Sequence, residues 1–318
     1  MKILVLAVFG IGNTINKTPM IQALRRLYPD ARIDMVCQDK GVDVVRGWRE
    51  LGSVWSYRDA REICEKPGYD YYVVTRPANG WLTHVVPPGG KLVGGWDDKE
   101  CWDKHEIEWN MDLAYQMGYE GPVPDPHFEI GSEYEPIPGP HDRELIGVHV
   151  DCLPGWEWKH WPLEHWAALI RMFDPEKYRI VLQGGPTGRD DAKELLRVLG
   201  KYAIDVGVVD MVGGLTLKQS GWLLKQFRLF VTVDSGPSHM ASALKVPVIT
   251  LFGPTSATKN RPWFGQVVQV DSGFEMPCIP CQEAPGGMDL MKNCQHRACL
   301  TALTPEQVFG EVVEFLES

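Results

Sequence analysis

Short apolar runs and amphipathic stretches alternate at the start of the chain. The run Ile3–Val8 is apolar throughout, which is typical of a strand buried on both faces of a parallel sheet, and Arg32–Cys37 is a second strand candidate. Between them, Gly10–Lys17 is predicted to be a polar loop, and Thr18-Pro19 supplies the cap and first-turn proline of a helix. The order strand, helix, strand predicts a βαβ unit and therefore a parallel α/β sheet.

The same alternation resumes after residue 144. Strands are predicted at Ile146–Val150, Arg179–Leu182, Leu229–Val233 and Val246–Leu251, and helices at Leu163–Met172, Asp190–Leu199, Leu217–Phe227, Pro237–Leu244 and Pro305–Leu316. Each of these strands leads into a loop rich in glycine, proline or polar residues. The four loops begin at Asp151, Gln183, Asp234 and Phe252. The carboxyl ends of parallel strands meet at one edge of a sheet, where ligands bind, so these four loops are expected to converge.

The middle of the chain has a different composition. Residues 75–142 are rich in proline, glycine and tryptophan, and Pro136–His141 is predicted to be a linker. The predicted domains are 1–140 and 141–303, the second with a cysteine-rich loop at 278–299, followed by a helix at 304–318 that packs back on the first domain. The predicted fold class is α/β, with two Rossmann-like parallel-sheet domains.

Length and charge narrow the function classes. A chain of 318 residues exceeds the size of most single cores, in agreement with two domains. Its 42 acidic and 32 basic residues give a net charge of −10, which argues against nucleic acid as a partner. The apolar start is too short for a membrane span and is better explained as a first strand than as a secretion signal. Eight cysteines in such a chain predict free thiols and a cytoplasmic location.

The segment after the predicted strand Leu229–Val233 carries the strongest local signal. Asp234 would stand at the mouth of the sheet and accept hydrogen bonds from sugar hydroxyls, while Gly236 lets a ligand approach the start of the next helix. His239 falls in the first turn of that helix, where its imidazole can reach the same anion. Lys159, just before another predicted helix, can act as a point charge on a diphosphate. The alternatives are an ordinary capped turn and a solvated loop lysine.

The glycines after the first strand invite comparison with a dinucleotide-binding fingerprint. Gly10 and Gly12 are present, but Ile15 stands where the third glycine belongs. A nicotinamide-dependent oxidoreductase is therefore disfavoured. A loop that lets a substrate approach the domain fits better.

Four of the eight cysteines are clustered near the end of the chain. Cys278-x2-Cys281-x12-Cys294-x4-Cys299 resembles a structural four-thiolate site, for which zinc is the usual ion and iron is conceivable. His296 is a less favoured ligand. The alternative is a set of buried free cysteines, which are common in proteins.

Taken together, these segments resemble glycosyltransferase family 9, the lipopolysaccharide heptosyltransferases. The resemblance is carried by Gly10–Asn13, Thr18–Arg25, Tyr28–Ala31, Lys159–Glu164, Asp234–His239, Leu251–Thr255 and Leu303–Val308. It implies a GT-B architecture, in which the C-terminal domain binds a nucleotide diphosphate sugar such as ADP-heptose and the N-terminal domain binds a saccharide or glycolipid acceptor. It further implies inverting transfer with no catalytic cofactor, within lipopolysaccharide biosynthesis and with peripheral contact at the inner membrane.

Site residues follow from the motifs and from this resemblance. The donor is expected to contact Lys159, Gln183, Gly184, Thr216, Asp234, Ser235, Gly236 and His239. The acceptor is expected to contact Gly12, Asn13, Lys17, Trp96 and Trp102, since aromatic faces pack against sugar rings. Lys159 and His239 would also act in catalysis, by taking up charge on the departing diphosphate.

Asn13 departs from the pattern of the family. Members that transfer heptose carry an aspartate there, which is implied as the general base, and an amide cannot accept the proton of the acceptor hydroxyl. Another carboxylate such as Asp151 could replace it, or the acceptor could need no base. The alternative function is a nucleotide-sugar-binding protein without transfer activity. A sugar epimerase of the same fold is a further, less favoured alternative.

Overall fold

The computed structural model describes residues 1–7, 10–64, 68–75, 89–94, 102–131, 143–205, 207–269 and 278–317. The chain divides into two compact units, Met1–Ser132 (unit 1) and Glu133–Ser318 (unit 2). The predicted linker and Trp96 lie outside the described residues, so the structure says nothing of them. Among the described residues, no helix is long and apolar enough to cross a membrane.

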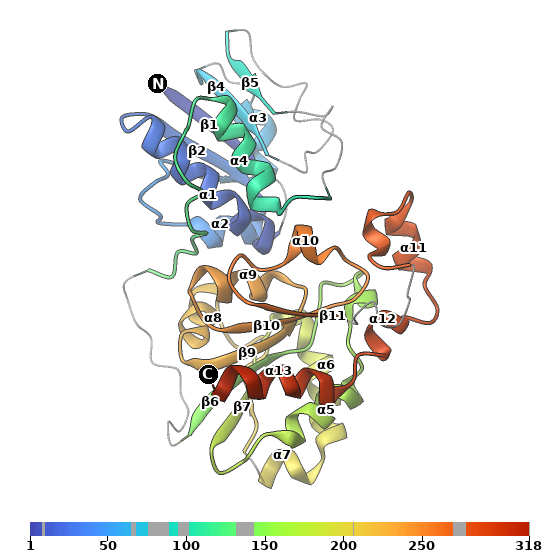
Figure 1. Cartoon of the computed structure of the whole chain (residues 1–318). Helices are drawn as coiled ribbons and strands as arrows, with labels where there is room; N and C mark the ends of the chain where they lie inside the picture. Colours follow the sequence, from blue (N-terminus) through green and yellow to red (C-terminus); the bar gives the residue numbers. More distant parts are fainter. Residues whose placement is uncertain are drawn as a thin grey trace. The chain divides into compact units, whose positions relative to one another are not determined.

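Unit 1 is built on a parallel sheet with strand order β3-β2-β1-β4-β5. Its elements are β1 (Lys2–Ala7), α1 (Ile11–Leu27), β2 (Arg32–Cys37), α2 (Asp39–Val45), β3 (Val54–Ser56), η1 (Tyr57–Asp59), α3 (Ala60–Cys64), β4 (Tyr71–Val74), β5 (Lys91–Val93) and α4 (Glu106–Gln116). Strands β1 and β2 are buried along almost their whole length, as the apolar runs predict. Helices α1 and α4 pack against each other (Figure 1).

The predicted loop at Gly10–Lys17 is wrong, because α1 begins at Ile11 and continues through Pro19. A proline inside a helix leaves the carbonyl four residues earlier without its amide partner. Here that carbonyl belongs to Ile15, and the hydroxyl of Thr18 donates to it at 2.7 Å. The side chain that looked like a helix cap therefore repairs the helix from within, and Asn13 lies in the first turn of α1.

Unit 2 contains a larger parallel sheet with strand order β11-β10-β9-β6-β7-β8. Its elements are β6 (Glu144–His149), η3 (Glu157–Lys159), α5 (Leu163–Met172), β7 (Tyr178–Leu182), η4 (Pro186–Gly188), α6 (Arg189–Leu199), α7 (Lys201–Asp205), β8 (Val209–Asp210), α8 (Leu217–Leu224), β9 (Phe227–Val233), α9 (Gly236–Ala243), β10 (Val248–Phe252), α10 (Ala257–Asn260), β11 (Gln266–Gln269), η5 (Cys281–Glu283), α11 (Gly287–Asn293), α12 (Ala298–Thr301) and α13 (Pro305–Glu317).

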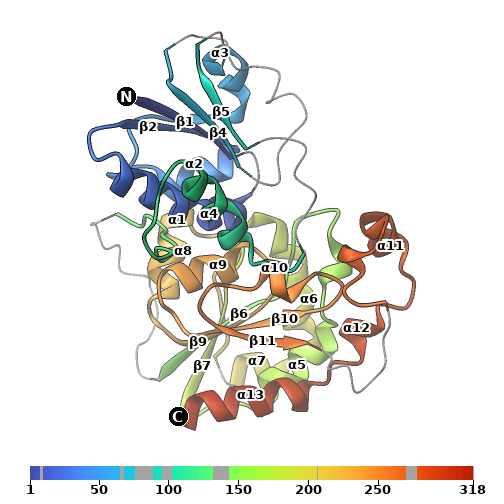
Figure 2. The same ribbon diagram turned by 45° about the horizontal axis from the view of Figure 1, so that its top comes forward.

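Helices cover both faces of this sheet. Apolar side chains of α5, α6 and α13 share one core cluster with β6, β7, β9 and β10. Helices α8 and α9 lie on the opposite side of the sheet from α5 and α13 in both views (Figures 1 and 2). The predicted C-terminal helix is present, and its Phe309 packs edge-on against Phe173 within unit 2. Its predicted contact with the first domain stays a prediction.

Each sheet has one place where the strand order reverses. In unit 2 the reversal falls between β6 and β9, and in unit 1 it falls between β1 and β4. At such a switch point the following connections run to opposite faces of the sheet and leave a crevice at the carboxyl ends. The loops after β6 and β9 carry Lys159 and Asp234, and β1 leads to Asn13. The predicted convergence of the four loops in unit 2 is confirmed, because their strands are adjacent in the order β10-β9-β6-β7.

Candidate functional site

An ion pair joins the two loops at the switch point of unit 2. Lys159 Nζ lies 2.7 Å from Asp234 Oδ2 and 3.3 Å from the Asp234 carbonyl oxygen. Thr255 donates its hydroxyl to the same Oδ2 at 2.7 Å, and the Lys159 ammonium stands 4.8 Å from the ring centroid of Trp156. Lys159 is therefore not a solvated loop lysine. Three of the four predicted loops are linked through these contacts.

The start of α9 is open to an anion. Ser235 is the N-cap residue, yet its side chain makes no capping hydrogen bond, and no acidic residue occupies the first turn. Pro237 fits there because it has no amide hydrogen to satisfy. First-turn amides and the helix dipole favour negative charge at this end. His239, 7% exposed, follows in the same turn.

A buried chain of polar side chains supports the N-cap residue. His149 Nε2 lies 2.7 Å from Asp151 Oδ1, and His149 Nδ1 lies 3.1 Å from the hydroxyl of Thr232 and 3.3 Å from that of Ser235. Burial alone would raise the pKa of Asp151, but the charge and hydrogen bond of His149 and the hydroxyl of Thr187 hold that pKa below its usual range. Asp151 is thus engaged with His149, and its role as a base stays a prediction.

The predicted donor residues on the neighbouring loop are close to Asp151. A β-carbon on Gly184 would come within 2.9 Å of Asp151 Oδ1, so the two loops are in contact. Gln183 is 3% exposed, and its side-chain oxygen has no hydrogen-bond partner among the described residues. Thr216, in contrast, is exposed and accepts a hydrogen bond from the amide of Gln219, which caps α8.

The cysteine-rich segment packs on the loop that carries Lys159. Trp158, Cys281 and Met291 form one small buried cluster, joined by Trp156. Arg297 donates a hydrogen bond to the carbonyl of Glu157 at 3.0 Å. The segment therefore supports the Lys159 loop from behind.

The four clustered cysteines are free thiols. Burial and the neighbouring cysteines raise the pKa of Cys299 to about 12, and burial followed by Cys278 and Cys294 raises the pKa of Cys281. Across the described part of the chain, however, no group of three or more His, Cys, Asp or Glu side chains has the arrangement of a metal site. The metal at these cysteines stays a prediction.

The switch point of unit 1 holds a second polar group. Asn13 Nδ2 lies 2.9 Å from Glu106 Oε1 and 3.1 Å from Oε2, and Asn16 Nδ2 lies 3.3 Å from Oε2. Lys17, 1% exposed, forms an ion pair with the same carboxylate. Gly12 and Asn13 are partly exposed at the start of α1, and Trp102 is partly buried. The acceptor role of Trp102 stays a prediction.

Sequence reasoning missed Glu106 and His149. Glu106 stands 93 residues from Asn13 in a stretch with no motif, so only the packing of α4 on α1 reveals it. The sequence pattern could have identified His149. It is the one polar side chain in the run Leu145–Val150, and it stands at the carboxyl end of a predicted buried strand.

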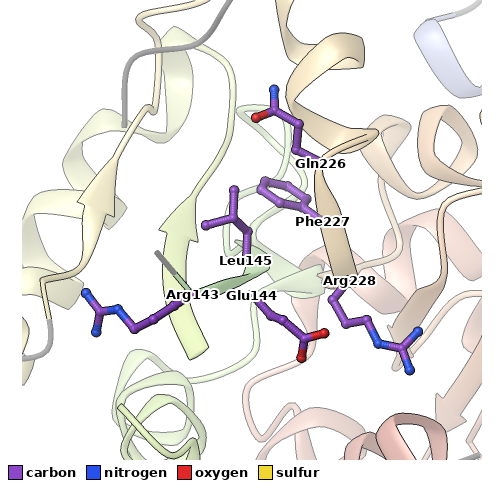
Figure 3. Close-up of a pocket in the computed structure, with 6 residues that line it drawn as sticks. All are labelled: Arg143, Glu144, Leu145, Gln226, Phe227 and Arg228. Carbon is purple, nitrogen blue, oxygen red and sulfur yellow. The ribbon is translucent and has the colours of Figure 1, made fainter. Parts of the chain in front are cut away.

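A hollow at the opposite edge of the unit 2 sheet contains none of the residues of the candidate site. It has a volume of about 430 Å³ and is lined by Arg143, Glu144, Leu145, Gln226, Phe227 and Arg228 (Figure 3). These residues stand at the amino ends of β6 and β9. The ion pair and the start of α9 lie beyond the carboxyl ends of the same strands.

Comparison with known families agrees with this arrangement. The sequence model of glycosyltransferase family 9 (heptosyltransferase) matches residues 75–291, which is more than half of the chain. The chain belongs to glycosyltransferase family 9. The predicted family and enzyme class are confirmed, and the alternative of a binding protein without transfer gains no support.

Individual relatives of family 9 span the whole chain. Lipopolysaccharide heptosyltransferase 1 of Pseudomonas aeruginosa is 24% identical, covering 99% of this chain and 98% of its own. The structure of E. coli ADP-heptose lipopolysaccharide heptosyltransferase II matches with a TM-score of 0.75 and 21% identity, covering 99% of this chain and 98% of that one. The iron-containing dodecameric glycosyltransferase TibC of enterotoxigenic E. coli matches with a TM-score of 0.65 and 15% identity, covering 100% of this chain and 78% of that one. The predicted GT-B class, with two Rossmann-like units, is confirmed.

Proposed function

We propose that this glycosyltransferase moves heptose from ADP-heptose to a saccharide of a lipopolysaccharide core. Membership of family 9 supports the reaction class. The names of the matched heptosyltransferases support the donor sugar and the acceptor class. The observation that carries the proposal is the Lys159–Asp234 pair beside the uncapped start of α9, because it combines a cation, the positive end of a helix dipole and a carboxylate at the switch point of one sheet.

The donor would be held by groups with complementary chemistry. An ammonium has three hydrogens, and Lys159 directs at most two of them to Asp234, so a third is available to a diphosphate oxygen. Asp234 uses Oδ2 for Lys159 and Thr255, and no described residue donates to its Oδ1, which is free to accept from a sugar hydroxyl. Gln183, at the end of the neighbouring strand β7, would stand on the nucleoside side of the site. Ser235, Gly236 and Gly184 would form the rim of this site, and Thr216 the outer edge.

The transfer requires stabilisation of the negative charge that develops on the departing diphosphate. The acceptor hydroxyl attacks the anomeric carbon from the face opposite the diphosphate. As the new carbon–oxygen bond forms, the bond from that carbon to the diphosphate oxygen breaks, ADP leaves with the bonding electrons, and the proton of the hydroxyl passes to solvent water. Lys159, His239 and the amides at the start of α9 would stabilise that developing charge, which preorganised donors do at little reorganisation cost. The acceptor would contact Gly12, Asn13, Trp96 and Trp102, whereas Lys17, predicted to contact it, is buried in its ion pair with Glu106 and would act only behind the surface.

We also propose a structural metal at Cys278, Cys281, Cys294 and Cys299. The sequence spacing Cys278-x2-Cys281-x12-Cys294-x4-Cys299 favours it, and the structural relative TibC is described as containing iron. The ion, zinc or iron, would be held as four thiolates. Purified protein should contain one metal per chain by elemental analysis, and Cys281→Ser with Cys299→Ser should lose it. A metal content unchanged in that double variant would refute the site.

A transfer assay tests the main proposal. The full chain is incubated with ADP-heptose and with lipooligosaccharide from a heptose-deficient bacterium, and the product is examined by mass spectrometry. The expected product carries one added heptosyl group and requires Lys159. Transfer from UDP-glucose but not from ADP-heptose would contradict the proposed donor. A cytoplasmic location with peripheral contact at the inner membrane stays a prediction.

A further inference from the structure

A buried polar cluster stands behind Asn13 in unit 1. Asn16, Lys17 and Glu106 are 2%, 1% and 3% exposed, and the Glu106 carboxylate is the group that the others share. A buried ion pair adds little net stability, because the cost of removing charges from water offsets their attraction. Of these four residues only Asn13 reaches the surface. Stability alone therefore does not explain the cluster, and its one exposed member lies at the switch point.

The carboxylate determines how the Asn13 amide faces. An amide has two donor hydrogens on nitrogen and an acceptor oxygen, and the two ends look alike in shape. With Nδ2 toward Glu106, both carboxylate oxygens receive a hydrogen bond at 2.9 and 3.1 Å. The reverse orientation would set the amide oxygen against a carboxylate, lone pair to lone pair. Asn13 Oδ1 must therefore point away from Glu106, and no described residue donates to it.

The carboxylate is itself held from behind. Lys17 neutralises Glu106, and Asn16 donates to Oε2 at 3.3 Å. Glu106 is also the first residue of α4, where the helix dipole favours a negative charge. Residues of α1 and α4 thus fix one carboxylate, and that carboxylate fixes one exposed amide.

We propose that Glu106 is a positioning residue for the acceptor, which turns Asn13 Oδ1 outward to accept the hydrogen bond of the attacking saccharide hydroxyl. The inference rests on the proposed function. A neutral amide in a fixed orientation accepts a hydrogen bond from the hydroxyl and so fixes the direction of the oxygen lone pairs of that hydroxyl, whose proton passes to solvent water as the new bond forms. Orientation of a nucleophile in this way contributes strongly to rate. The negative charge itself stays buried on α4.

The test is a cycle of variants in the full chain: Asn13→Ala, Asn13→Asp, Glu106→Gln and the double variant Asn13→Asp/Glu106→Gln. ADP-heptose is the donor probe, and lipooligosaccharide from a heptose-deficient bacterium is the acceptor probe. Glu106→Gln and Asn13→Ala should each lower kcat/KM for the acceptor about 10- to 100-fold, the effect of losing one hydrogen bond to a charged or oriented group. The KM for ADP-heptose should change less than about twofold.

The double variant separates a positioning role from a structural one. Asn13→Asp alone places two carboxylates in contact, so both the unfolding temperature and the activity should fall. Adding Glu106→Gln reverses the pair, with the amide now on α4, and should restore both to within about threefold of the wild type in activity. A merely structural Glu106 predicts that the two losses add instead.

Asp34→Asn is the matched control. Asp34 is also a buried carboxylate of unit 1, 1% exposed, and it pairs with Arg32 on β2. Its loss should lower the unfolding temperature without changing the acceptor KM. The inference is overturned if Glu106→Gln behaves like this control, or if Asn13→Asp with Glu106 intact becomes more active. A wild type that transfers no heptose would refute the proposed function and the inference with it, whereas an active wild type with unaffected variants would refute the inference alone.

Discussion

Replacing Lys159 by methionine tests whether its ion pair with Asp234 stabilises unit 2 and whether Lys159 binds the nucleotide. Methionine keeps the length of the side chain but removes the charge, and it leaves the Asp234 carboxylate without its cation. The side chains of Lys159 and Asp234 are 15% and 7% exposed. Breaking a buried pair costs about 3–5 kcal/mol. Because Lys159 retains some contact with water, we expect a loss of about 2–3 kcal/mol, or about 5–10 °C in the unfolding temperature of unit 2.

The same substitution should weaken nucleotide binding. Losing one charge-assisted hydrogen bond to a diphosphate costs about 1.5–3 kcal/mol, which corresponds to about 10- to 100-fold in the dissociation constant of ADP. Isothermal titration calorimetry, carried out well below both unfolding temperatures, separates this effect from the loss of stability. Lys159→Met/Asp234→Asn should recover part of the stability but not the affinity, because the amide no longer requires a cation.

Lys193→Met is the matched control for a lysine on the same unit. Lys193 is 72% exposed and pairs with Asp190 at 3.6 Å, so its removal should cost less than about 0.5 kcal/mol. If Lys159→Met binds ADP as tightly as this control does, Lys159 is not part of the donor site. If it is also as stable as the control, the ion pair does not exist in solution.

Three further substitutions examine the surroundings of the site. His149→Gln should raise the pKa of Asp151, since burial alone raises it. The stability that the low pKa provides is present above about pH 4 and is lost as the pH falls through the native pKa. Thermal melts of wild type and variant should therefore differ at pH 7 and approach each other as the pH falls through the native pKa of Asp151; equal melts at pH 7 would contradict this. Trp158→Ala should lower the free energy of unfolding by about 3–5 kcal/mol and weaken ADP binding in calorimetry, because the ring supports the Lys159 loop. An unchanged affinity for ADP would show that this loop does not take part in donor binding. Gly147→Ala should lower the free energy of unfolding, measured with denaturant, by about 1–3 kcal/mol, because its β-carbon would collide with the ring of Phe227. Adding Phe227→Leu should restore part of that free energy, and a double variant as unstable as Gly147→Ala would contradict this explanation.

The elements of unit 2 were predictable because their patterns are local. Helix α5 has the predicted bounds, and the strands β7 and β9 overlap the predicted runs almost completely. Predicted helix Leu217–Phe227 extends too far, because Phe227 begins β9 and packs against Phe230. An apolar residue at a helix end and one at a strand start look alike in sequence, so periodicity alone cannot separate them.

The donor residues were predictable for a different reason. Asp234 and Lys159 follow strands that end at one edge of a parallel sheet, so topology alone brings their loops together. Their direct ion pair could not be derived from the sequence, because the two residues are 75 positions apart and their contact depends on how the side chains pack. Glu106 is the opposite case. It reaches Asn13 through the packing of α4 on α1, and no spacing rule connects the two residues.

A crystal structure of the full chain with ADP shows directly where the donor nucleotide binds. We expect the diphosphate within hydrogen-bond distance of Lys159 Nζ and at the start of α9, with the nucleoside beside Gln183. ADP bound instead in the hollow between Arg143 and Arg228, at the opposite edge of the same sheet, would contradict this expectation.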